Sequence, residues 1–297
     1  RTPHEIDCLA EELDLIWAAG KDGVYMIDRK NFKFSAELKH KPKFSYVRSL
    51  VVDKDGLLWI GDENGLTSYN GKEFVVYDDK NGLPDKRVNT IYEDSKGVLW
   101  VGTWSGLAVR ENDEWKIITK KDGLIDDMVN VIFEDADGGM WFGSYVAPAG
   151  GVSYFKAGQW QYFSTANGLA HNNIAAIAQA DDGSIWIGSG LFDRGGAAQL
   201  LNSAGIWSVS KVISKNDGLA GEKARSIFQD SLGALWIGSE FDGIARFNNG
   251  KWFVYTDKDG FSHMEVKALL EDEDGNLWFG TKDGLTYIEA HKLTLLP

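Results

Sequence analysis

The sequence has a single cysteine, Cys8, so no disulfide can form within the chain. It has five prolines, and no apolar run long enough to span a membrane as a helix. Basic residues are also scarce, at 31 against 44 acidic residues, which gives a net charge of −13. That charge argues against general binding to nucleic acid or anionic lipid. We therefore expect no nucleic-acid partner and no direct membrane insertion.

Glycine and tryptophan are abundant by contrast, with 34 and 12 residues. A hydrophobic share of 43% excludes a disordered chain. The chain begins at Arg1 and shows no signal peptide, which is compatible with the removal of a leader or a neighbouring segment. The positions of the tryptophans give the first positive information about the fold.

Seven tryptophans share one sequence frame, in which a glycine follows two or three residues later. Six copies read apolar-Trp-apolar-Gly, as in Leu58–Gly61 and Leu99–Gly102. The tryptophans of the frame are Trp17, Trp59, Trp100, Trp141, Trp186, Trp236 and Trp278. Their spacings of 42, 41, 41, 45, 50 and 42 residues fill the chain with seven repeats. We expect one domain over residues 1–297.

The repeat that starts at Val88 shows the expected strands. Val88–Glu93 is rich in β-branched and aromatic residues, and an Asp-Ser-Lys-Gly turn separates it from a second strand over Val98–Thr103. Further turns bound strands over Leu107–Arg110 and Trp115–Thr119. Four short antiparallel strands per repeat are typical of a propeller blade. No sustained helical period occurs, so we expect almost no helix.

The sequence therefore predicts an all-β fold, a seven-bladed β-propeller with four antiparallel strands per blade. Each blade is apolar on both faces, and a closed ring gives each one two neighbours. The repeat tryptophans should pack between blades. We expect His4–Glu11 as the first strand of blade one, Lys292–Leu296 as the fourth strand of blade seven, and no strand exchange between the termini. The expected blades are approximately 1–40, 41–81, 82–122, 123–167, 168–217, 218–259 and 260–297.

Two further marks recur within the frame. Asn/Asp-Gly-Leu/Phe precedes the first strand at Asn81, Asp122, Asn167, Asp217 and Asp259. Gly-Leu or Gly-Ile opens the third strand at Gly65, Gly106, Gly243 and Gly284. Together with Leu-Trp-Ile-Gly, these marks resemble the two-component-regulator propeller repeat. That repeat is found in the extracytoplasmic sensor regions of bacterial hybrid histidine kinases and related sensors, and the resemblance covers the whole chain.

The resemblance implies a ring that senses a ligand without catalysis and without a cofactor, in the periplasm or outside the cell. It implies a small molecule or carbohydrate, or a protein, as the partner, and a fused or associated signalling module. Kinase-linked members carry a second ring, a sandwich domain, a membrane span and a kinase. This sequence is therefore either a fragment of such a protein or a free-standing ring, and both interpretations stay open. Blade one lacks the Asp-x-x-Gly turn, and the link 39–45 lacks Asn-Gly-Leu.

We expect a ligand site on the face that carries the links between second and third strands and the links between blades. Two second-to-third links are expanded, Ser144–Gly151 in blade four and Ser189–Gly196 in blade five. The links on this face supply Trp104, Tyr145, Phe192, Asp193, Arg194 and Phe241. Aromatic and polar groups on loops suit a sugar or a peptide. Local packing of the loops is the alternative.

One repeat position should face the central channel. It holds Asp7, Arg48, Asn89, Asn130, Ala175, Arg225 and Lys267. The cations Arg48, Arg225 and Lys267 suit an anionic or polyhydroxyl ligand, because guanidinium groups bind such ligands in a bidentate manner. An internal ion-pair ring with Asp7 and nearby acids is the alternative.

The links between blades supply Arg87, Met128, His171, Lys223 and His263, of which Arg87, His171 and His263 are candidate ligand contacts. The two histidines lack a supporting carboxylate spacing, so we expect no metal. Acidic turns such as Asp53–Gly56 lack the spacing of a calcium loop, and their recurrence favours a role in the turns themselves.

The leading functional prediction is a non-enzymatic sensor propeller, since no Gly-x-Ser-x-Gly, His-Glu-x-x-His or P-loop motif is present. One alternative is an enzyme similar to streptogramin lyases, which need a magnesium-supported His/Glu cluster. Its candidates late in the chain are His263, Glu265, Glu271 and His291. Another alternative is a protein-interaction scaffold whose outer edge carries Trp115, Trp160, Trp207 and Trp252, although such repeat positions usually pack within a blade.

Overall fold

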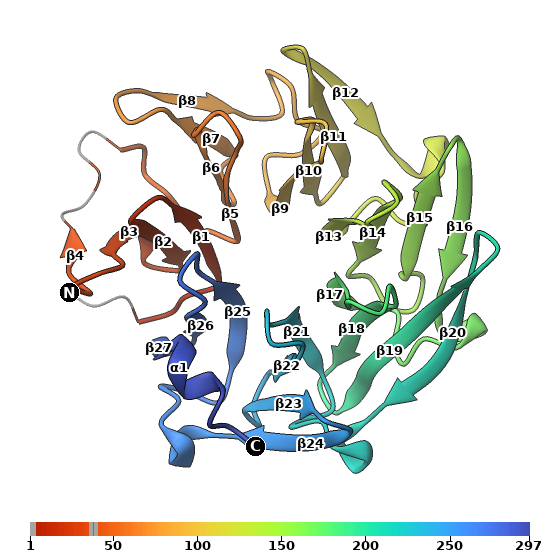
Figure 1. The fold of residues 1–297 in the computed structure, drawn as a ribbon. Helices are drawn as coiled ribbons and strands as arrows, with labels where there is room; N and C mark the ends of the chain where they lie inside the picture. The colour runs from red at the N-terminus through yellow and green to blue at the C-terminus, as the bar shows by residue number, and fades with distance from the viewer. Residues whose placement is uncertain (1–3, 36–37, 39–40) are drawn as a thin grey trace.

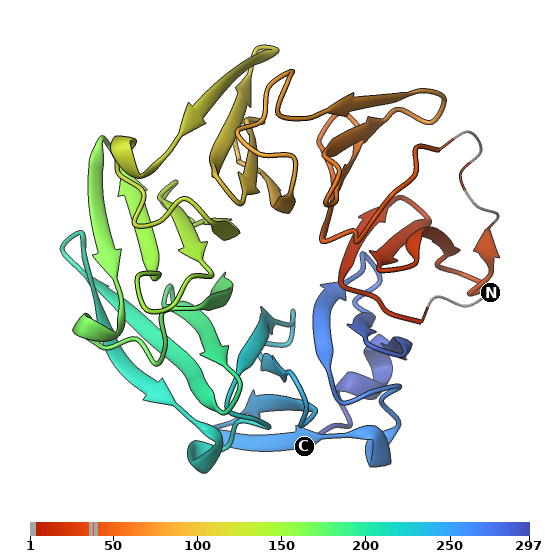
Figure 2. The ribbon, with the colours of Figure 1, turned by 180° about the vertical axis from the view of Figure 1, so that it is seen from behind.

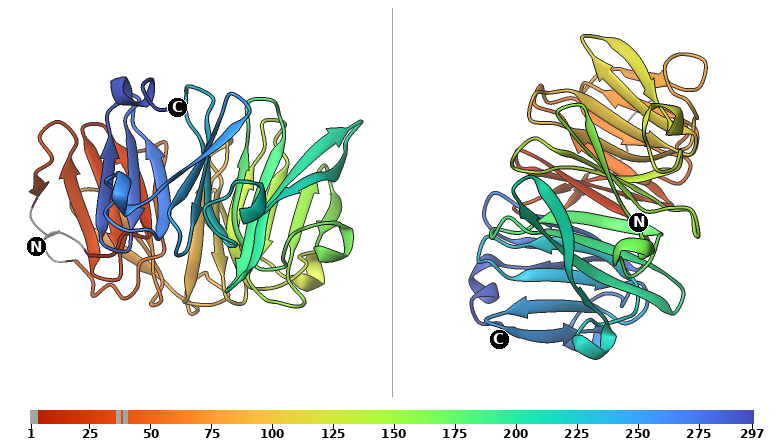
Figure 3. Two further views of the ribbon diagram at one scale, coloured as in Figure 1. Left: turned by 90° about the horizontal axis from the view of Figure 1, so that it is seen from below. Right: turned by 90° about the vertical axis from the view of Figure 1, so that its right-hand side faces the viewer.

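Seven antiparallel sheets are arranged around one axis in the computed structural model, which describes residues 4–35, 38 and 41–297 (Figure 1). The sheets follow one another around the ring in chain order, and Figure 2 shows the same order from behind. The strands run roughly along the ring axis (Figure 3), so the links between them fall on two opposite faces. The predicted all-β, seven-bladed propeller is confirmed.

Each sheet is built from consecutive strands. The first three sheets are β1 (Cys8–Glu12), β2 (Leu15–Gly20), β3 (Gly23–Asp28) and β4 (Phe34–Ser35); β5 (Ser49–Val52), β6 (Leu58–Gly61), β7 (Leu66–Tyr69) and β8 (Phe74–Tyr77); and β9 (Val88–Glu93), β10 (Leu99–Thr103), β11 (Gly106–Glu111) and β12 (Glu114–Ile118). The next three are β13 (Val129–Glu134), β14 (Met140–Ser144), β15 (Val152–Lys156) and β16 (Gln159–Phe163); β17 (Ile174–Gln179), β18 (Ile185–Leu191), β19 (Arg194–Ser203) and β20 (Ile206–Ile213); and β21 (Ala224–Gln229), β22 (Leu235–Ser239), β23 (Ile244–Asn248) and β24 (Lys251–Tyr255). The last comprises β25 (Val266–Glu271), β26 (Leu277–Thr281) and β27 (Gly284–Ile288).

Within the described part of the chain, blade seven has three strands, and the predicted fourth strand over Lys292–Leu296 is wrong. The short helix α1 (Ala290–Leu293) occupies this part of the chain instead. Leu293 is 1% exposed and packs in one cluster with Trp236 and Phe279. In blade five the fourth-strand Trp207 packs on Trp141 of blade four in the same manner. One apolar side chain that reaches the core between two blades is sufficient there, so a helix can replace the strand.

The termini meet without strand exchange, as predicted: within the described residues, no sheet combines strands from both ends of the chain. The first strand starts at Cys8, four residues later than expected, and ends at Glu12. The backbone N–H of Ile6 donates to the carbonyl of Thr281 at 2.9 Å. The N–H of Glu273 also donates to Glu11 at 3.1 Å, in the way that Lys54 donates to Glu93 between blades two and three. The closing junction is therefore built like an interior one.

The repeat tryptophans form the core between blades. Trp59, Trp141, Trp236 and Trp278 are at most 1% exposed. The indole N–H of Trp141 donates at 3.0 Å to the turn residue Asp135, six positions earlier. The other carboxylate oxygen of Asp135 accepts the N–H groups of Asp137 and Gly139. These contacts give the acidic turns a structural role, because one aspartate both closes the turn and satisfies the buried indole.

The Asn/Asp-Gly-Leu mark also has a structural explanation. The backbone N–H of Ser214 donates to the Asp217 carboxylate at 2.9 Å, which caps a short 3-10 helix over Lys215–Asp217. Gly218 follows with φ +124°, and a Cβ there would lie 2.5 Å from Trp252. Leu219 is 3% exposed in the core. Each residue of the mark thus serves the junction between two blades.

Alanine at Gly218 should cost more stability than alanine at Gly260, the matched glycine of the next link. Gly260 has φ +96°, and no atom lies within 4 Å of the position that a Cβ would take, so Gly260→Ala carries only the backbone penalty, about 1–2 kcal/mol. Gly218→Ala adds the overlap with Trp252 and should lose at least about 1 kcal/mol more in urea unfolding. Equal losses for the two variants would contradict this role of Gly218.

Candidate functional site

A cavity of about 550 Å³ opens at one mouth of the central channel. All seven residues of the predicted channel position line it: Asp7, Arg48, Asn89, Asn130, Ala175, Arg225 and Lys267. The remaining lining residues come from links on the expected face: Tyr46, Trp104, Met128, Tyr145 and Lys223. The cavity therefore lies where the repeat register and the links on that face were predicted to meet.

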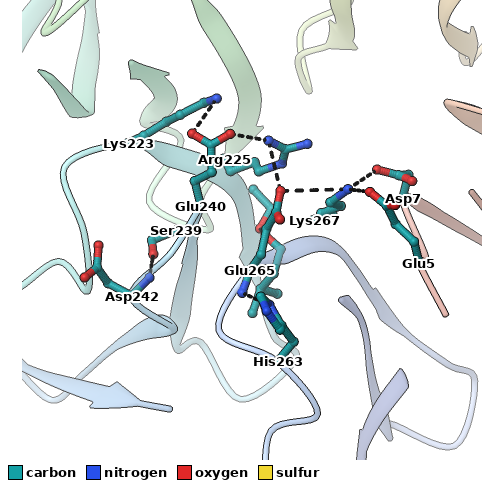
Figure 4. A network of polar contacts seen from close by, with 12 residues as sticks. Glu5, Asp7, Lys223, Arg225, Ser239, Glu240, Asp242, His263, Glu265 and Lys267 are labelled. Carbon is teal, nitrogen blue, oxygen red and sulfur yellow. Dashed lines mark hydrogen bonds and ion pairs between the residues drawn. The ribbon is translucent and has the colours of Figure 1, made fainter. Parts of the chain in front are cut away.

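One wall of the cavity is a chain of ion pairs that begins between blades five and six (Figure 4). The Lys223 ammonium contacts one oxygen of Glu240 at 3.0 Å, and Nη1 of Arg225 contacts the other at 3.0 Å. Nη1 of Arg225 also contacts Glu265 at 3.3 Å. Lys223 donates in addition to the Tyr145 hydroxyl at 3.0 Å, which joins the expanded link of blade four to this wall.

Lys267 continues the chain of ion pairs into blade one. Its ammonium lies 3.8 Å from Glu265 and 2.8 Å from Asp7, and it also pairs with Glu5. Its side chain is only 4% exposed. Burial alone would lower the pKa of Lys267, but the hydrogen bonds and charges of Asp7 and Glu5 outweigh burial and raise that pKa above its usual value.

Two groups beside Lys267 respond to the same environment. Burial would raise the pKa of Glu5, but Lys267 and the Tyr46 hydroxyl together lower it below its usual value. The pKa of Tyr46 is raised, first by burial and then by the negative charge of Asp7. The Tyr46 hydroxyl therefore stays protonated and donates to Asp7 at 2.9 Å.

The cations of the cavity are paired with carboxylates. Arg48 contacts Glu63 at 3.2 Å, and the other pairs are those above. The four cations are Arg48, Lys223, Arg225 and Lys267, and the five acids around them are Glu5, Asp7, Glu63, Glu240 and Glu265. These nine residues, all within the described part of the chain, sum to a local charge of −1. The wall they form is thus the ion-pair arrangement that was the alternative prediction, without an excess of positive charge among them.

Free hydrogen-bonding capacity remains on Arg225. Both of its ion pairs use Nη1, and Nε and Nη2 have no partner among the residues that the structure describes (Figure 4). The side chain is 25% exposed and lines the cavity. At the cavity wall its guanidinium thus keeps two donor nitrogens, Nε and Nη2, without a protein partner among the described residues.

The other wall carries Trp104, which is 37% exposed. Its indole N–H donates to the Asn89 side-chain oxygen at 3.0 Å. The Arg87 guanidinium lies over the indole at 4.3 Å from the ring centroid. Arg87 is held by Asp85, and this hydrogen bond is the main reason that the pKa of Asp85 falls to about 2. Arg87 supports the cavity wall from outside the lining.

The two candidate histidines act as turn caps. Nδ1 of His171 accepts the N–H of Asn173 at 3.0 Å, and Nδ1 of His263 accepts that of Glu265 at 2.9 Å. In blades three and four the same repeat position holds Asp85 and Asp126, whose carboxylates accept the backbone N–H groups of Arg87 and Met128 in the same way. Burial, followed by the charges of Arg194 and Lys223, lowers the pKa of His171, which favours the neutral ring that the cap needs. Neither histidine lines the cavity.

Four other candidates lie on the rim outside the cavity lining: Phe192, Asp193, Arg194 and Phe241. Phe192 and Phe241 are 76% and 59% exposed. The expanded link of blade five forms an extension of the β18–β19 hairpin with Phe192 at its tip. The long spacing after Trp186 has a second cause, because Gly196–Ser214 is five residues longer than Gly106–Thr119 in blade three. That insertion lengthens β19 and β20.

Several residues of the site were not predicted as site residues. Tyr46 lies in the link to blade two, and Glu5 precedes β1. Glu63 lies in the link between the second and third strands of blade two. The repeat frame assigns no role to any of these positions. Lys223 and Met128 were recognised only as members of the links between blades. The one indication in the sequence was that these residues lie in links on the face of the site. That indication does not show which link residues turn toward the channel.

The candidates for a lyase cluster are not brought together. His263 and Glu265 lie on the cavity face, and Glu265 is paired with Arg225. Glu271, at the other end of β25, accepts the N–H of Ser231 at 2.8 Å, and His291 on α1 is 70% exposed. In the described part of the chain, no group of three or more His, Cys, Asp or Glu side chains could hold a metal.

The fourth-strand tryptophans pack inward, as their repeat position indicated. Trp207 is 4% exposed, and Trp115 lies edge-on to Tyr77 at 5.5 Å between ring centroids. Trp160 and Trp252 contact Phe155 and Phe247 of their own blades. These contacts leave no apolar edge of exposed tryptophans for a partner protein.

Comparison with known proteins agrees with the repeat. A family model described as "two component regulator propeller" matches residues 42–64, 82–105, 123–146, 168–190 and 260–283. No curated protein sequence matches the chain. No helix among the described residues has the length and apolarity needed to cross a membrane.

Solved structures share the fold. The extracellular domain of the hybrid two component system BT3049 from B. thetaiotaomicron has a TM-score of 0.82 and 22% identity over 99% of this chain and 40% of that one. The extracellular domain of the one component system BT4673 from B. thetaiotaomicron has a TM-score of 0.73 and 16% identity, over 96% of this chain and 38% of that one. Virginiamycin B lyase from Staphylococcus aureus has a TM-score of 0.70 and 15% identity, over 96% of this chain and 94% of that one. The chain thus spans about 40% of the length of these two extracellular domains.

Proposed function

The chain belongs to the proteins built from two component regulator propeller repeats, and we propose that it is a non-catalytic sensor module that binds a small polyhydroxylated molecule, such as a carbohydrate, in the channel cavity. The proposal includes a location in the periplasm or outside the cell and a fused or associated signalling module that receives the signal. The similar sensor domains, described as extracellular, support this part.

The observation that carries the proposal is the pairing of charges around an open cavity. A hydroxyl group both donates and accepts hydrogen bonds, so a polyol can use the free Arg225 donors and the neighbouring carboxylate oxygens of the same wall. The local charge of −1 disfavours an acidic ligand, since such a ligand would add negative charge beside Asp7. Of the two ligand classes inferred from the sequence, the polyhydroxylated one therefore fits better.

Trp104 supplies the apolar part of the site. Ligand cavities combine aromatic surface with a few fixed polar groups that orient the ligand. Here the indole lies in the same cavity as Arg225 and Tyr145. A sugar ring has both an apolar C–H face and a polar hydroxyl rim, so it can contact the indole while its hydroxyls meet the ion-pair wall.

The test is a calorimetric and thermal-shift comparison of neutral sugars with their acidic counterparts, glucose with glucuronate and cellobiose with cellobiouronate. At least one neutral sugar should bind and raise Tm, and its acidic partner should bind more weakly. Arg225→Lys retains the positive charge but loses the two free donors, and should weaken binding about tenfold, or about 1.4 kcal/mol. The control, Arg194→Lys on the rim, should bind normally. Tighter binding of the acidic sugars, or full binding by Arg225→Lys, would contradict the proposal.

A further inference from the structure

We propose that Asp85 and Arg87 are positioning residues that hold Trp104 as the stacking surface for one face of a neutral sugar ring. The ligand class rests on the proposed function above, whereas the positioning of the indole is a property of the unliganded protein and can be tested separately.

Trp104 differs from every other tryptophan that the structure describes. It is the one tryptophan among them that is exposed, at 37%, whereas the others are buried or half-buried. It lies between β10 and β11, outside the repeat frame and outside the fourth-strand positions. The core therefore does not require it, and it faces the cavity.

Hydrogen bonds fix the edge of the Trp104 indole. Its N–H donates to the side-chain oxygen of Asn89 at 3.0 Å. The amide nitrogen of Asn89 in turn donates at 3.0 Å to the carbonyl of Val129 in the next blade. The indole N–H is thus already used, so the ring offers its face, rather than a donor, to a ligand.

A cation covers one face of the same ring. The Arg87 guanidinium lies 4.3 Å from the ring centroid, and Asp85 holds it through Nε at 2.9 Å and Nη2 at 2.5 Å. Asp85 also accepts the hydroxyl of Ser105, the residue after Trp104, at 2.8 Å. Asp85 therefore joins the guanidinium behind the ring to the backbone that carries the ring.

This arrangement restricts what the other face of the ring can bind. An aromatic face attracts cations through its quadrupole, but Arg87 already occupies that interaction. A second cation on the opposite face would be repelled by the guanidinium, whereas a neutral C–H surface would not. The geometry thus selects a neutral apolar ligand face, such as that of a pyranose ring.

The unliganded protein provides the first test. The emission of Trp104 is obtained as the difference between the wild-type protein and Trp104→Phe. We expect Arg87→Ala and Asp85→Ala to increase the acrylamide quenching of this emission at least twofold and to lower its anisotropy. Arg87→Lys, which retains a cation but lacks the planar group, should give an intermediate result. Arg194→Ala on the rim is the matched control and should change neither quantity. Unchanged quenching and anisotropy in Arg87→Ala would overturn the positioning role.

Binding provides the second test, with glucose, cellobiose and tetramethylammonium as probes. The sugar that binds the wild-type protein should bind Arg87→Ala at least fivefold more weakly, and tetramethylammonium should bind Arg87→Ala better than the wild type. Equal sugar affinity in both proteins would overturn the stacking role. Altered quenching with no sugar bound by the wild-type protein would refute the proposed function and the ligand class, but would support the positioning of the indole.

Discussion

Replacement of Trp236 by alanine should lower the free energy of unfolding by about 3–5 kcal/mol. The side chain is 0% exposed and packs against Tyr255 of its own blade and Phe279 of blade seven, so its removal leaves a cavity at the junction of two blades. Its indole N–H also donates at 2.8 Å to Asp230, which is 2% exposed, and the carboxylate would lose that partner. Urea unfolding followed by circular dichroism measures the change.

Two variants separate the packing of this residue from its hydrogen bond. Trp236→Phe keeps much of the apolar volume, so it should cost less stability than alanine. It still removes the N–H donor, and the unpaired Asp230 oxygen should cost about 1–3 kcal/mol. Trp104→Phe, at the exposed indole of the cavity, should change stability by less than about 0.5 kcal/mol. A loss below about 1 kcal/mol for Trp236→Ala would mean that the repeat tryptophan is not the main contact between blades.

The repeat made the fold and the channel position predictable from the sequence. A fixed frame sets the register of the first strand in every blade, so equivalent residues such as Asn89 and Lys267 point into the same channel even though their side chains differ. The Trp-Gly frame likewise predicted indoles in the core, and six of its seven tryptophans are at most 5% exposed, whereas Trp100 is half-buried. In each case one physical constraint, the packing of a blade between two neighbours, is repeated seven times.

The rest of the site depends on contacts that do not repeat. Glu5 and Tyr46 lie outside the strand frame, and they join the site because they meet Lys267 across blade boundaries. Phe192 was expected at the site for its exposed link, but the hairpin extension carries it to the rim. Leu293 shows the same limit in the core, since it packs at a junction from a helix rather than from the expected strand. Side-chain direction in links is set by tertiary contacts, which a single sequence does not reveal.

Lys267 is the charged residue whose loss should matter most. It is 4% exposed and lies between Asp7, Glu5 and Glu265, which belong to blades one and seven. Breaking a buried ion pair by removing one partner costs more than the pair contributes, because the remaining charges stay buried without compensation. Without Lys267, three carboxylates would face one another, with Arg225 as the one remaining cation in contact with them among the described residues.

The pKa shifts define where in pH this contribution exists. The pKa of Lys267 is raised above 10.5, so its contribution is complete below 10.5 and is lost as pH rises through the higher value of the folded state. The pKa of Glu5 is lowered below 4.5, so its contribution is present above 4.5 and is lost as pH falls through the value of the folded state. The ion pairs therefore stabilise the protein most between these two limits.

Lys267→Met should accordingly lower the free energy of unfolding by about 3–5 kcal/mol near neutral pH. The difference from the wild type should shrink below pH 4.5, where protonation relieves the repulsion between the unpaired carboxylates, and again well above pH 10.5, where the wild-type ammonium itself is lost. Lys282→Met, at an exposed lysine of the same blade, is the control and should stay within about 0.5 kcal/mol at every pH. Urea unfolding at a series of pH values measures both variants. A difference that does not change with pH would show that Lys267 stabilises the ring through the packing of its alkyl chain and not through its charge.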